Sequence, residues 1–383
     1  MILEEGTLKR LVIISMVAIV IITLLIGGCG TSTTTTTAQT TTTSSSTPPP
    51  VIKLTSAMYL PIAHSFTAIQ DQWGKDIVAK SNGRVEITFY PGGQLLTGPQ
   101  TADGIVNDIA DIAFAHIGYT PGRFPVTESL DLPIGYPSGW VGSHVATDFY
   151  AQFKPAEWDK YHVLLFNAGT TAGLMMHDDK ITKMEQLKGK TLRGAGEVAD
   201  AIAALGATPR DIPMAEMYDS VSKGVVDGTL VGIETLKTFK MADVCKYTTF
   251  AWQVGNMYTF YLAMNLEKWN ALPADIKTIF NDVSKDYADK WAVAWNNSDV
   301  AGIQYSLSIA GNEVFQLTAA EGQRWHDAVQ PVLGKYVEKR KAAGDNNGQA
   351  YIDYIKGRVE YWKPIEDQQN IASPFDLNLP VAE

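Results

Sequence analysis

The segment Lys188-Gly189-Lys190-Thr191-Leu192-Arg193-Gly194-Ala195-Gly196, followed by Glu197-Val198-Ala199-Asp200-Ala201-Ile202-Ala203-Ala204-Leu205-Gly206-Ala207, organises the chain. Its first part predicts a short strand that ends on Arg193, and two glycines form the turn that follows. A helix is predicted from about Glu197 to Gly206, because glycine is the usual helix terminator. Arg193 is therefore expected at the carboxyl end of a strand, where open α/β sheets bind their ligands. The alternative for Arg193 is an arginine that pairs with a surface carboxylate.

Two further motifs follow this segment, Ile212-Pro213-Met214-Ala215-Glu216-Met217-Tyr218 and Lys223-Gly224-Val225-Val226-Asp227-Gly228. Their order resembles the signature of the solute receptors of TRAP transporters, the DctP-type family. The resemblance extends more weakly from about Lys53 to about Ala343, and it implies that Arg193 binds the carboxylate of the substrate. The matching residues are Leu187-Lys188-Gly189, Arg193, Leu205-Gly206-Ala207, Glu216, Tyr218 and Gly224-Val225-Val226-Asp227-Gly228.

The 333 or so residues after position 50 exceed what one hydrophobic core usually serves, so two lobes are expected. Alternating strand and helix patterns in the first of them predict a parallel sheet with helices on both faces. The pattern places strands at 51–55, 84–89 and 111–115, and helices at 64–81 and 101–107. A strand at 161–166 leads towards the second lobe, and the aromatic run 258–265 returns from it.

We predict an α/β protein with the type II periplasmic-binding-protein fold, in which two α/β lobes are joined by a hinge and followed by long C-terminal helices. One long helix is expected to start at Pro273, and another at a capping box of Thr318 and Glu321. The tryptophans of these helices are predicted to lie in the core. The predicted boundaries are 51–169 with 263–300 for lobe one, 170–262 with 301–340 for lobe two, and 341–383 for a tail that packs on the lobes.

The N-terminus has the features of an export signal. Lys9-Arg10 precede an apolar run at 11–26, and Ile26-Gly27-Gly28-Cys29 resembles a bacterial lipobox. We predict a signal peptide at 1–28 that exports the protein. A lipidated Cys29, followed by a Thr/Ser/Pro tether, forms the segment 29–50 and is expected to hold the protein at the membrane. The alternative is a membrane-spanning anchor, for which the apolar run is close to the lower length limit. Lipidation would leave Cys245 as a lone thiol, which is predicted to be a packing residue.

Several functional classes are disfavoured. A net charge of -10 disfavours nucleic acid as a partner. The motifs Gly-x-Ser-x-Gly, His-Glu-x-x-His and Cys-x-x-Cys are missing from the sequence, so no enzyme, cofactor or metal site is predicted. Gly194-Ala195-Gly196-Glu197-Val198-Ala199 matches a dinucleotide fingerprint, but Glu197 would occupy the helix N-terminus where a pyrophosphate must bind.

Other ligand contacts are expected from the resemblance and from residue type. His116 aligns with a position that contacts ligand in some family members, and a structural histidine is the alternative. Met214 would cover the ligand, and Glu234 would receive a ligand hydroxyl or buttress Arg193. Thr170 and Thr171 are candidate hydrogen-bond partners, with turn formation as the alternative. The candidate walls of the cleft are Tyr59, Trp252 and Tyr258.

Sialic-acid-type members of the family carry a second arginine after Gly-Thr, whereas this chain reads Gly169-Thr170-Thr171-Ala172-Gly173. This departure favours a monocarboxylate over a dicarboxylate. The expected function is an exported receptor that binds a small organic acid and delivers it to a TRAP membrane permease. The alternatives are a ligand-sensing receptor for a signalling partner and an exported enzyme.

Overall fold

The structure is a computed structural model that describes residues 50–170 and 172–382. The predicted signal peptide, Cys29, the tether up to residue 49 and Thr171 lie outside the described residues.

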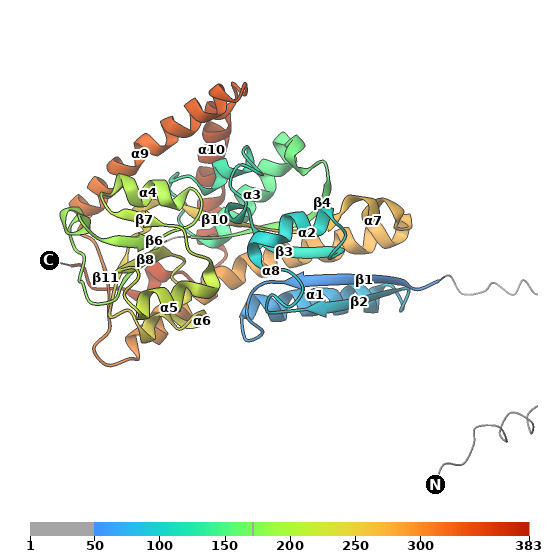
Figure 1. Ribbon diagram of the computed structural model, residues 1–383, viewed down its shortest axis with the longest axis horizontal. Helices are drawn as coiled ribbons and strands as arrows, with labels where there is room; N and C mark the ends of the chain where they lie inside the picture. Colours follow the sequence, from blue (N-terminus) through green and yellow to red (C-terminus); the bar gives the residue numbers. More distant parts are fainter. Residues whose placement is uncertain (1–49, 171, 383) are drawn as a thin grey trace, which may run out of the picture. The chain divides into compact units, whose positions relative to one another are not determined.

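The first lobe is built on a five-stranded sheet in the order β2-β1-β3-β10-β4 (Figure 1). Strand β1 is parallel to β2 and β3, as predicted, whereas β10 is antiparallel to both β3 and β4. The parallel arrangement predicted for the first three strands is therefore confirmed. Strand β10 alone runs the opposite way in this sheet, because it enters from the second lobe, and β4 on its far side has the same direction as β3. The bounds are β1 Ile52–Met58, β2 Val85–Tyr90, β3 Ile112–His116, β4 Tyr161–Thr170 and β10 Met257–Asn265.

Strand β10 also changes one predicted boundary. It pairs with β4 from Met257 onwards, where Met257 lies opposite Thr170. Residues 257–262, which we predicted for lobe two, are therefore part of the lobe-one sheet. The chain passes from the first sheet to the second between β4 and β5 and returns between β9 and β10, which gives two connections of a hinge.

The second lobe has a six-stranded sheet in the order β11-β9-β5-β8-β6-β7. Strand β6, which carries Arg193, is parallel to both β7 and β8, while β5 runs antiparallel to β8 and β9. The bounds are β5 Gly173–Met176, β6 Thr191–Arg193, β7 Thr208–Arg210, β8 Gly228–Val231, β9 Tyr247–Phe250 and β11 Glu313–Gln316.

Helices cover both sheets and tie them together. In lobe one, α1 begins where His64 accepts a hydrogen bond from the Phe66 amide, close to the predicted start. The long helix α8 begins after Pro273, as predicted, and spans both lobes: Trp291 stacks on Phe114, and Gly302 lies against the Ile233 carbonyl. The bounds are α1 Ser65–Lys80, α2 Thr101–Val106, α3 Gly139–Phe153, α4 Val198–Ala204, α5 Met217–Ser222, α6 Thr235–Thr238, α7 Leu266–Ala271, α8 Ala274–Leu307, α9 Ala319–Ala342 and α10 Gly348–Gln368.

The capping box predicted for α9 is only half formed. The Thr318 hydroxyl accepts the Glu321 amide at 3.2 Å. The Glu321 carboxylate does not return the bond, because it accepts the Met184 amide at 2.7 Å and the Trp325 indole at 3.0 Å. The Met184 amide ties the start of α9 to the second lobe, whereas Trp325 lies one turn further along α9 itself.

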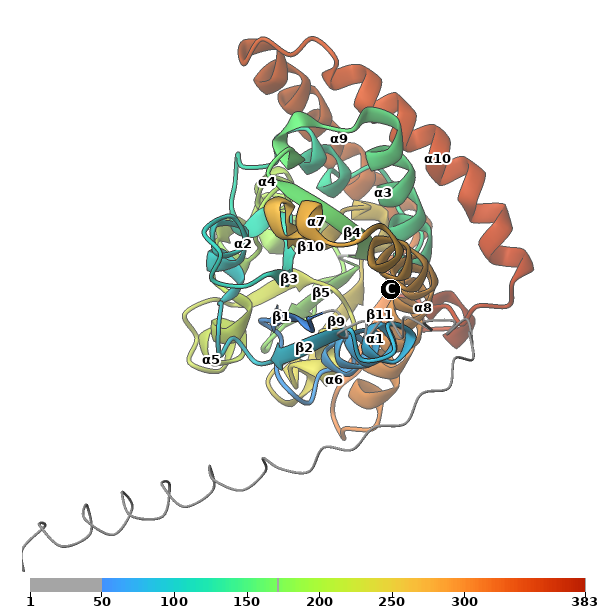
Figure 2. The same cartoon turned by 90° about the vertical axis from the view of Figure 1, so that its right-hand side faces the viewer.

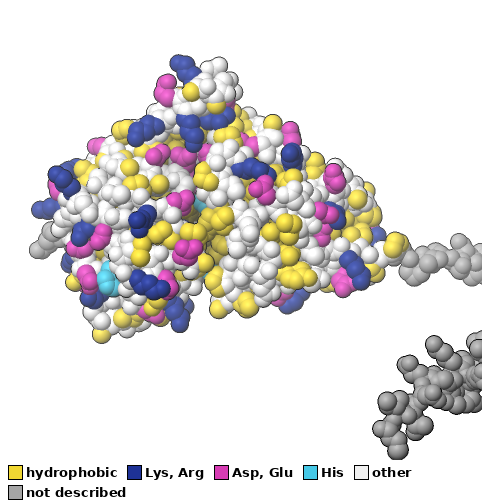
Figure 3. Space-filling model, viewed as in Figure 1, with side chains coloured by type: hydrophobic (Ala, Val, Ile, Leu, Met, Phe, Trp, Pro, Cys, Tyr) yellow, Lys and Arg dark blue, Asp and Glu magenta, His cyan; other side chains and the backbone are white. Residues whose placement is uncertain are grey.

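The C-terminal segment contacts both lobes. Helix α10 packs along α3 of the first lobe (Figure 2), and Val381 forms a bridge to Gln316 of β11 in the second. Acidic and basic side chains are interspersed over the face shown in Figure 3. Within residues 50–170 and 172–382, none of the helices has the length and apolar character needed to cross a membrane.

Candidate functional site

Arg193 is the last residue of β6 and is almost completely buried, with 2% of its surface exposed. Its Nε donates to the Ile212 carbonyl at 2.9 Å, and its Nη1 donates to the Tyr258 hydroxyl at 3.4 Å. Since Tyr258 lies in β10 of the first sheet, this second bond joins the two lobes. The strand order makes this placement possible, because β6 lies between β7 and β8 and its carboxyl end faces the other lobe.

The buried guanidinium has no acidic partner among the described residues. Its two hydrogen bonds within that part of the chain use two of five N–H donors, so three are left for another partner. A buried cation is normally paired, because removing it from water is costly. The alternative of a surface ion pair is therefore wrong, and the environment of Arg193 is suited to an anion.

Aromatic side chains surround the guanidinium. A cavity of about 20 Å³ lies beside it. The expected residues that line it are Tyr59, His116, Arg193, Met214 and Tyr258. Three further lining residues, Tyr119, Ala195 and Phe260, were not predicted.

Phe260 had a detectable signal, since it follows Tyr258 by two positions in a predicted strand and shares its face. Ala195 follows Arg193 by two positions in the quoted segment. Tyr119 had no such signal in the sequence, because it lies in the short helical turn Ile117–Tyr119 after β3 and not in a predicted strand.

The tyrosine hydroxyls at this cavity stay protonated at neutral pH. Burial raises the pKa of Tyr59, Tyr119 and Tyr258, and it outweighs the opposing effect of the Arg193 charge. The rings contact one another edge-on: Tyr59 and Tyr119 have centroids 5.4 Å apart, and His116 and Tyr258 4.7 Å. The site therefore combines one cation, neutral hydroxyl groups and aromatic walls.

His116 has a structural partner. Its Nε2 lies 2.9 Å from Oδ2 of Asp131, and both side chains are buried. The other oxygen of Asp131 accepts the Thr259 amide at 2.8 Å. Asp131 thus connects β3 to β10 across the lobe-one sheet and fixes the imidazole at the edge of the cavity.

Replacing Asp131 tests this structural role. Asp131→Ala leaves the buried His116 ring and the Thr259 amide without their acceptor, so the free energy of unfolding should fall by about 3 kcal/mol. Urea denaturation measures this change. Asp353→Ala, at an exposed position of α10, is the control and should leave the unfolding midpoint unchanged. Equal midpoints for both variants would contradict the role of Asp131.

Glu234 and Thr170 are not among the residues that line this cavity, although the charge of Glu234 acts on Tyr59 and raises its pKa. Both are buried and meet at Asp299 of α8, where the Glu234 amide donates to Oδ1 at 3.3 Å and the Thr170 hydroxyl makes a side-chain hydrogen bond. Arg193 donates to Ile212 and Tyr258 and not to Glu234, so the expected buttress is not formed, while the expected contact of Glu234 with a ligand hydroxyl stays a prediction. Burial raises the pKa of Glu234 to about 8, and burial together with the Glu234 charge raises the pKa of Asp299.

This carboxyl pair predicts a pH dependence of stability. Because the folded pKa of Glu234 lies above its usual value, the folded state binds more protons between about pH 4.5 and 8. Its contribution to stability is complete below that range and is lost as the pH rises through it. Glu234→Gln should therefore flatten the fall in melting temperature from pH 5 to pH 8.5. An unchanged slope would mean that this carboxyl group does not titrate in that range.

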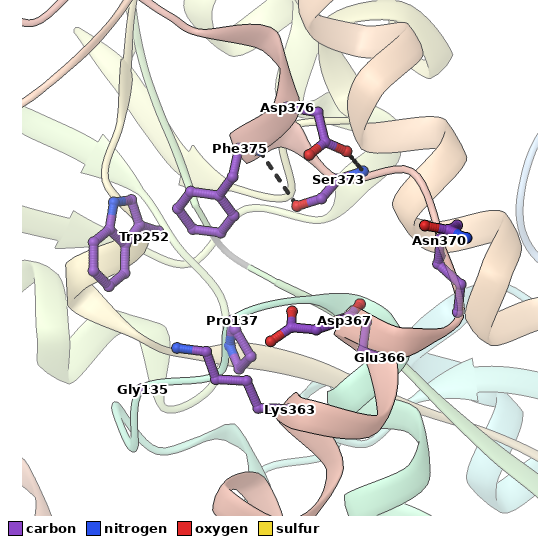
Figure 4. A pocket seen from close by; sticks show the side chains of 11 residues that line it. Gly135, Pro137, Trp252, Lys363, Glu366, Asp367, Asn370, Ser373, Phe375 and Asp376 are labelled. Carbon is purple, nitrogen blue, oxygen red and sulfur yellow. Dashed lines mark hydrogen bonds between the residues drawn. The ribbon is translucent and has the colours of Figure 1, made fainter.

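Trp252 lies outside the arginine site. It lines a larger cavity of about 550 Å³, where it contacts Phe375 edge-on at 5.5 Å (Figure 4). Size alone favours this cavity for a ligand. Its Lys363 and Asp367 are exposed to solvent, however, so neither needs a ligand to satisfy its charge. The buried, unpaired Arg193 makes the smaller cavity the candidate ligand site.

Within the described ranges, His, Cys, Asp and Glu form no group of three or more that could hold a metal ion. Cys245 is buried, and burial raises the pKa of its thiol to about 12, which disfavours reactivity.

Comparison with known proteins gives the family. Residues 60–340 match the bacterial extracellular solute-binding proteins of family 7, DctP. The C4-dicarboxylate-binding periplasmic protein DctP of Rhodobacter capsulatus is 26% identical over 277 residues, which cover 68% of this chain and 78% of the relative.

Two solved structures share the fold. A TRAP periplasmic solute binding protein from Desulfovibrio salexigens, solved as an open complex, has a TM-score of 0.72 and 27% identity, over 82% of this chain and 97% of that one. A TRAP solute binding protein from Rhodoferax ferrireducens in complex with benzoate has a TM-score of 0.77 and 23% identity, over 82% and 100%. With two lobes, a hinge and a family match over most of its length, the chain belongs to the family 7 bacterial extracellular solute-binding proteins, the DctP-type receptors of TRAP transporters.

Proposed function

We propose that this receptor binds a small organic monocarboxylate through Arg193 and delivers it to a TRAP membrane permease. The observation that carries the proposal is the buried guanidinium, which keeps three N–H donors beyond its bonds to the described residues. A carboxylate accepts two parallel hydrogen bonds from such a fork, and the bonds are strong because each is charge-assisted.

The lining of the cavity favours one carboxylate and an aromatic or hydroxylated body. Arg193 is the one cationic side chain among the described lining residues, so a second carboxylate of a dicarboxylate would lack a counter-ion. Tyr59, Tyr258 and Phe260 offer ring faces and hydroxyl groups. The relative that binds benzoate supports this reading, whereas the Rhodobacter relative shows that dicarboxylates occur within the family.

Binding requires the lobes to separate. The space beside Arg193 holds about one water molecule, which is less than any organic acid needs. Ligand entry therefore involves opening at the hinge, where β4 leads to β5 and β9 leads to β10, followed by closure over the ligand. The relative solved as an open complex supports such a movement.

We further propose that Cys29 is lipidated and that the tether 29–50 leaves the receptor free to turn at the membrane. Labelling of cells with an alkyne-tagged palmitate tests this: the protein should carry the label, and Cys29→Ala should remove it. Labelling of the variant at the wild-type level would contradict the anchor.

The ligand class is tested by thermal-shift measurements with benzoate, pyruvate, succinate and glucose. A ligand at about a hundred times its dissociation constant adds roughly 2.7 kcal/mol to stability, which corresponds to a shift of several degrees. One or both of the monocarboxylates should produce that shift, and glucose should not. A shift with succinate alone would overturn the monocarboxylate assignment, and a shift with glucose alone would overturn the acid assignment.

A further inference from the structure

A lysine near the end of α9 joins the two lobes beside the arginine site. Nζ of Lys339 lies 3.4 Å from Glu128 and 3.4 Å from Glu197. Glu128 belongs to the turn Thr127–Asp131 of the first lobe, which packs on β10, and Glu197 opens α4 of the second lobe. One cation therefore contacts a carboxylate from each side of the cleft.

The two carboxylates are far less exposed than the lysine. The Glu128 and Glu197 side chains are 5% and 13% exposed, against 55% for Lys339. Burial raises the pKa of Glu197 to about 7, and the Glu128 charge acts in the same direction while Lys339 opposes both. Glu128 and Glu197 thus repel each other across the lobe boundary, and Lys339 is the cation that offsets this repulsion.

This contact is directly connected to the ligand site. Glu197 follows Arg193 by four positions, and the second of the two glycines between them, Gly196, lies against Gly118 of the first lobe. Separation of the lobes would move Glu197 away from Glu128 and would break at least one of the two contacts of Lys339. The contact is therefore available only in the closed arrangement.

We propose that Lys339 is an inter-lobe lock, a positioning residue that holds the receptor closed by bridging Glu128 and Glu197. The lock stabilises the closed form whether or not a ligand is bound. It rests on the proposed function in one respect only, which is that the closed form covers a ligand at Arg193. Its energy is part of the free-energy difference between open and closed forms, so its removal shifts the population towards the open form and weakens every ligand by the same factor.

The lock is tested without any ligand by distances between two spin labels. The labels are placed on exposed side chains of opposite lobes, Ile109→Cys and Val225→Cys, in a Cys29→Ser background, and the buried Cys245 is left in place. Pulsed electron–electron double resonance should show a population with the short inter-label distance of the closed form in the protein with Lys339 intact. Lys339→Met should reduce the ratio of closed to open molecules about fivefold, within the usual range of coupling energies. Lys335→Met, an exposed lysine one turn earlier on α9, is the matched control and should change nothing.

A rescue variant separates this role from a general packing effect. If repulsion between the carboxylates opens the lobes, Lys339→Met with Glu197→Gln should return the closed population close to its original level. The proposal is overturned if Lys339→Met behaves like Lys335→Met, if the double variant stays open, or if the protein with Lys339 intact shows no closed population. If these tests succeed but no carboxylate binds, the proposal of the lock stands and the proposed ligand class is refuted.

Discussion

Arg193→Met should abolish carboxylate binding, with the dissociation constant for any acid ligand raised at least about a hundredfold. Loss of one partner of a buried, hydrogen-bonded charge pair costs about 2 to 5 kcal/mol, and 1.4 kcal/mol is a factor of ten. The methionine fills much of the same volume, so the aromatic walls keep their packing. Isothermal titration calorimetry with the best monocarboxylate from the thermal screen measures the effect.

Stability measurements on the same variant separate binding from folding. Because Arg193 is a buried cation without a carboxylate partner among the described residues, its replacement by an apolar side chain should leave the ligand-free melting temperature equal or higher. Arg193→Lys is the second control. It keeps the charge but loses the planar fork, so its affinity for the ligand should lie between that of the unaltered protein and that of Arg193→Met. Unchanged affinity in Arg193→Met would refute the carboxylate clamp.

Gly196→Ala should weaken ligand binding about tenfold or more. Gly196 has φ +58°, and a Cβ there would lie 3.2 Å from the Cα of Gly118 in the opposite lobe. The neighbour is backbone and cannot rotate away, so the two lobes would have to shift apart here by a few tenths of an ångström. This shift disfavours full closure over a ligand held by Arg193, and charge-assisted hydrogen bonds are weaker where water is not fully excluded. Calorimetry with the same monocarboxylate measures the loss.

Gly189→Ala is the matched control for backbone strain. Gly189 lies in the same lobe with φ +82°, and its added Cβ meets no atom within 4 Å. Both substitutions should therefore cost about 1 kcal/mol of stability, because a left-handed conformation is unfavourable for alanine. Only Gly196→Ala should lose affinity. Equal affinity losses in the two variants would assign the effect to strain and not to the contact between lobes.

Local pattern was sufficient for most of the elements. The periodicity that predicted helices at 64–81 and 101–107 agrees with α1 and α2 to within one residue at each end. Pro273 marked the start of α8, since a proline fits the entry to a helix and not its interior. These signals are carried by neighbouring residues, so no knowledge of the remaining chain is needed to read them.

The pairing of strands that lie far apart in the chain could not be predicted from local patterns. Neither the direction of β10 nor its register with β4 follows from its own residues, because both depend on a return path from the other lobe. The half-formed capping box of α9 has the same origin. Glu321 finds a better donor in Met184, which lies 137 positions earlier in the chain.

The sequence by itself determined the position of Arg193 at a strand end, because a strand, a glycine turn and a helix are local patterns. The class of the protein and the expected role of that arginine came from the resemblance of the surrounding motifs to the DctP-type receptors. Tertiary structure alone decided that Arg193 is buried without an acidic partner in the described chain, that Tyr119 and Phe260 join its walls, and that Trp252 lines a different cavity. The physical reason is that burial and charge pairing depend on groups that folding brings together from both lobes. The residues next to each group in the chain do not determine which distant groups it meets.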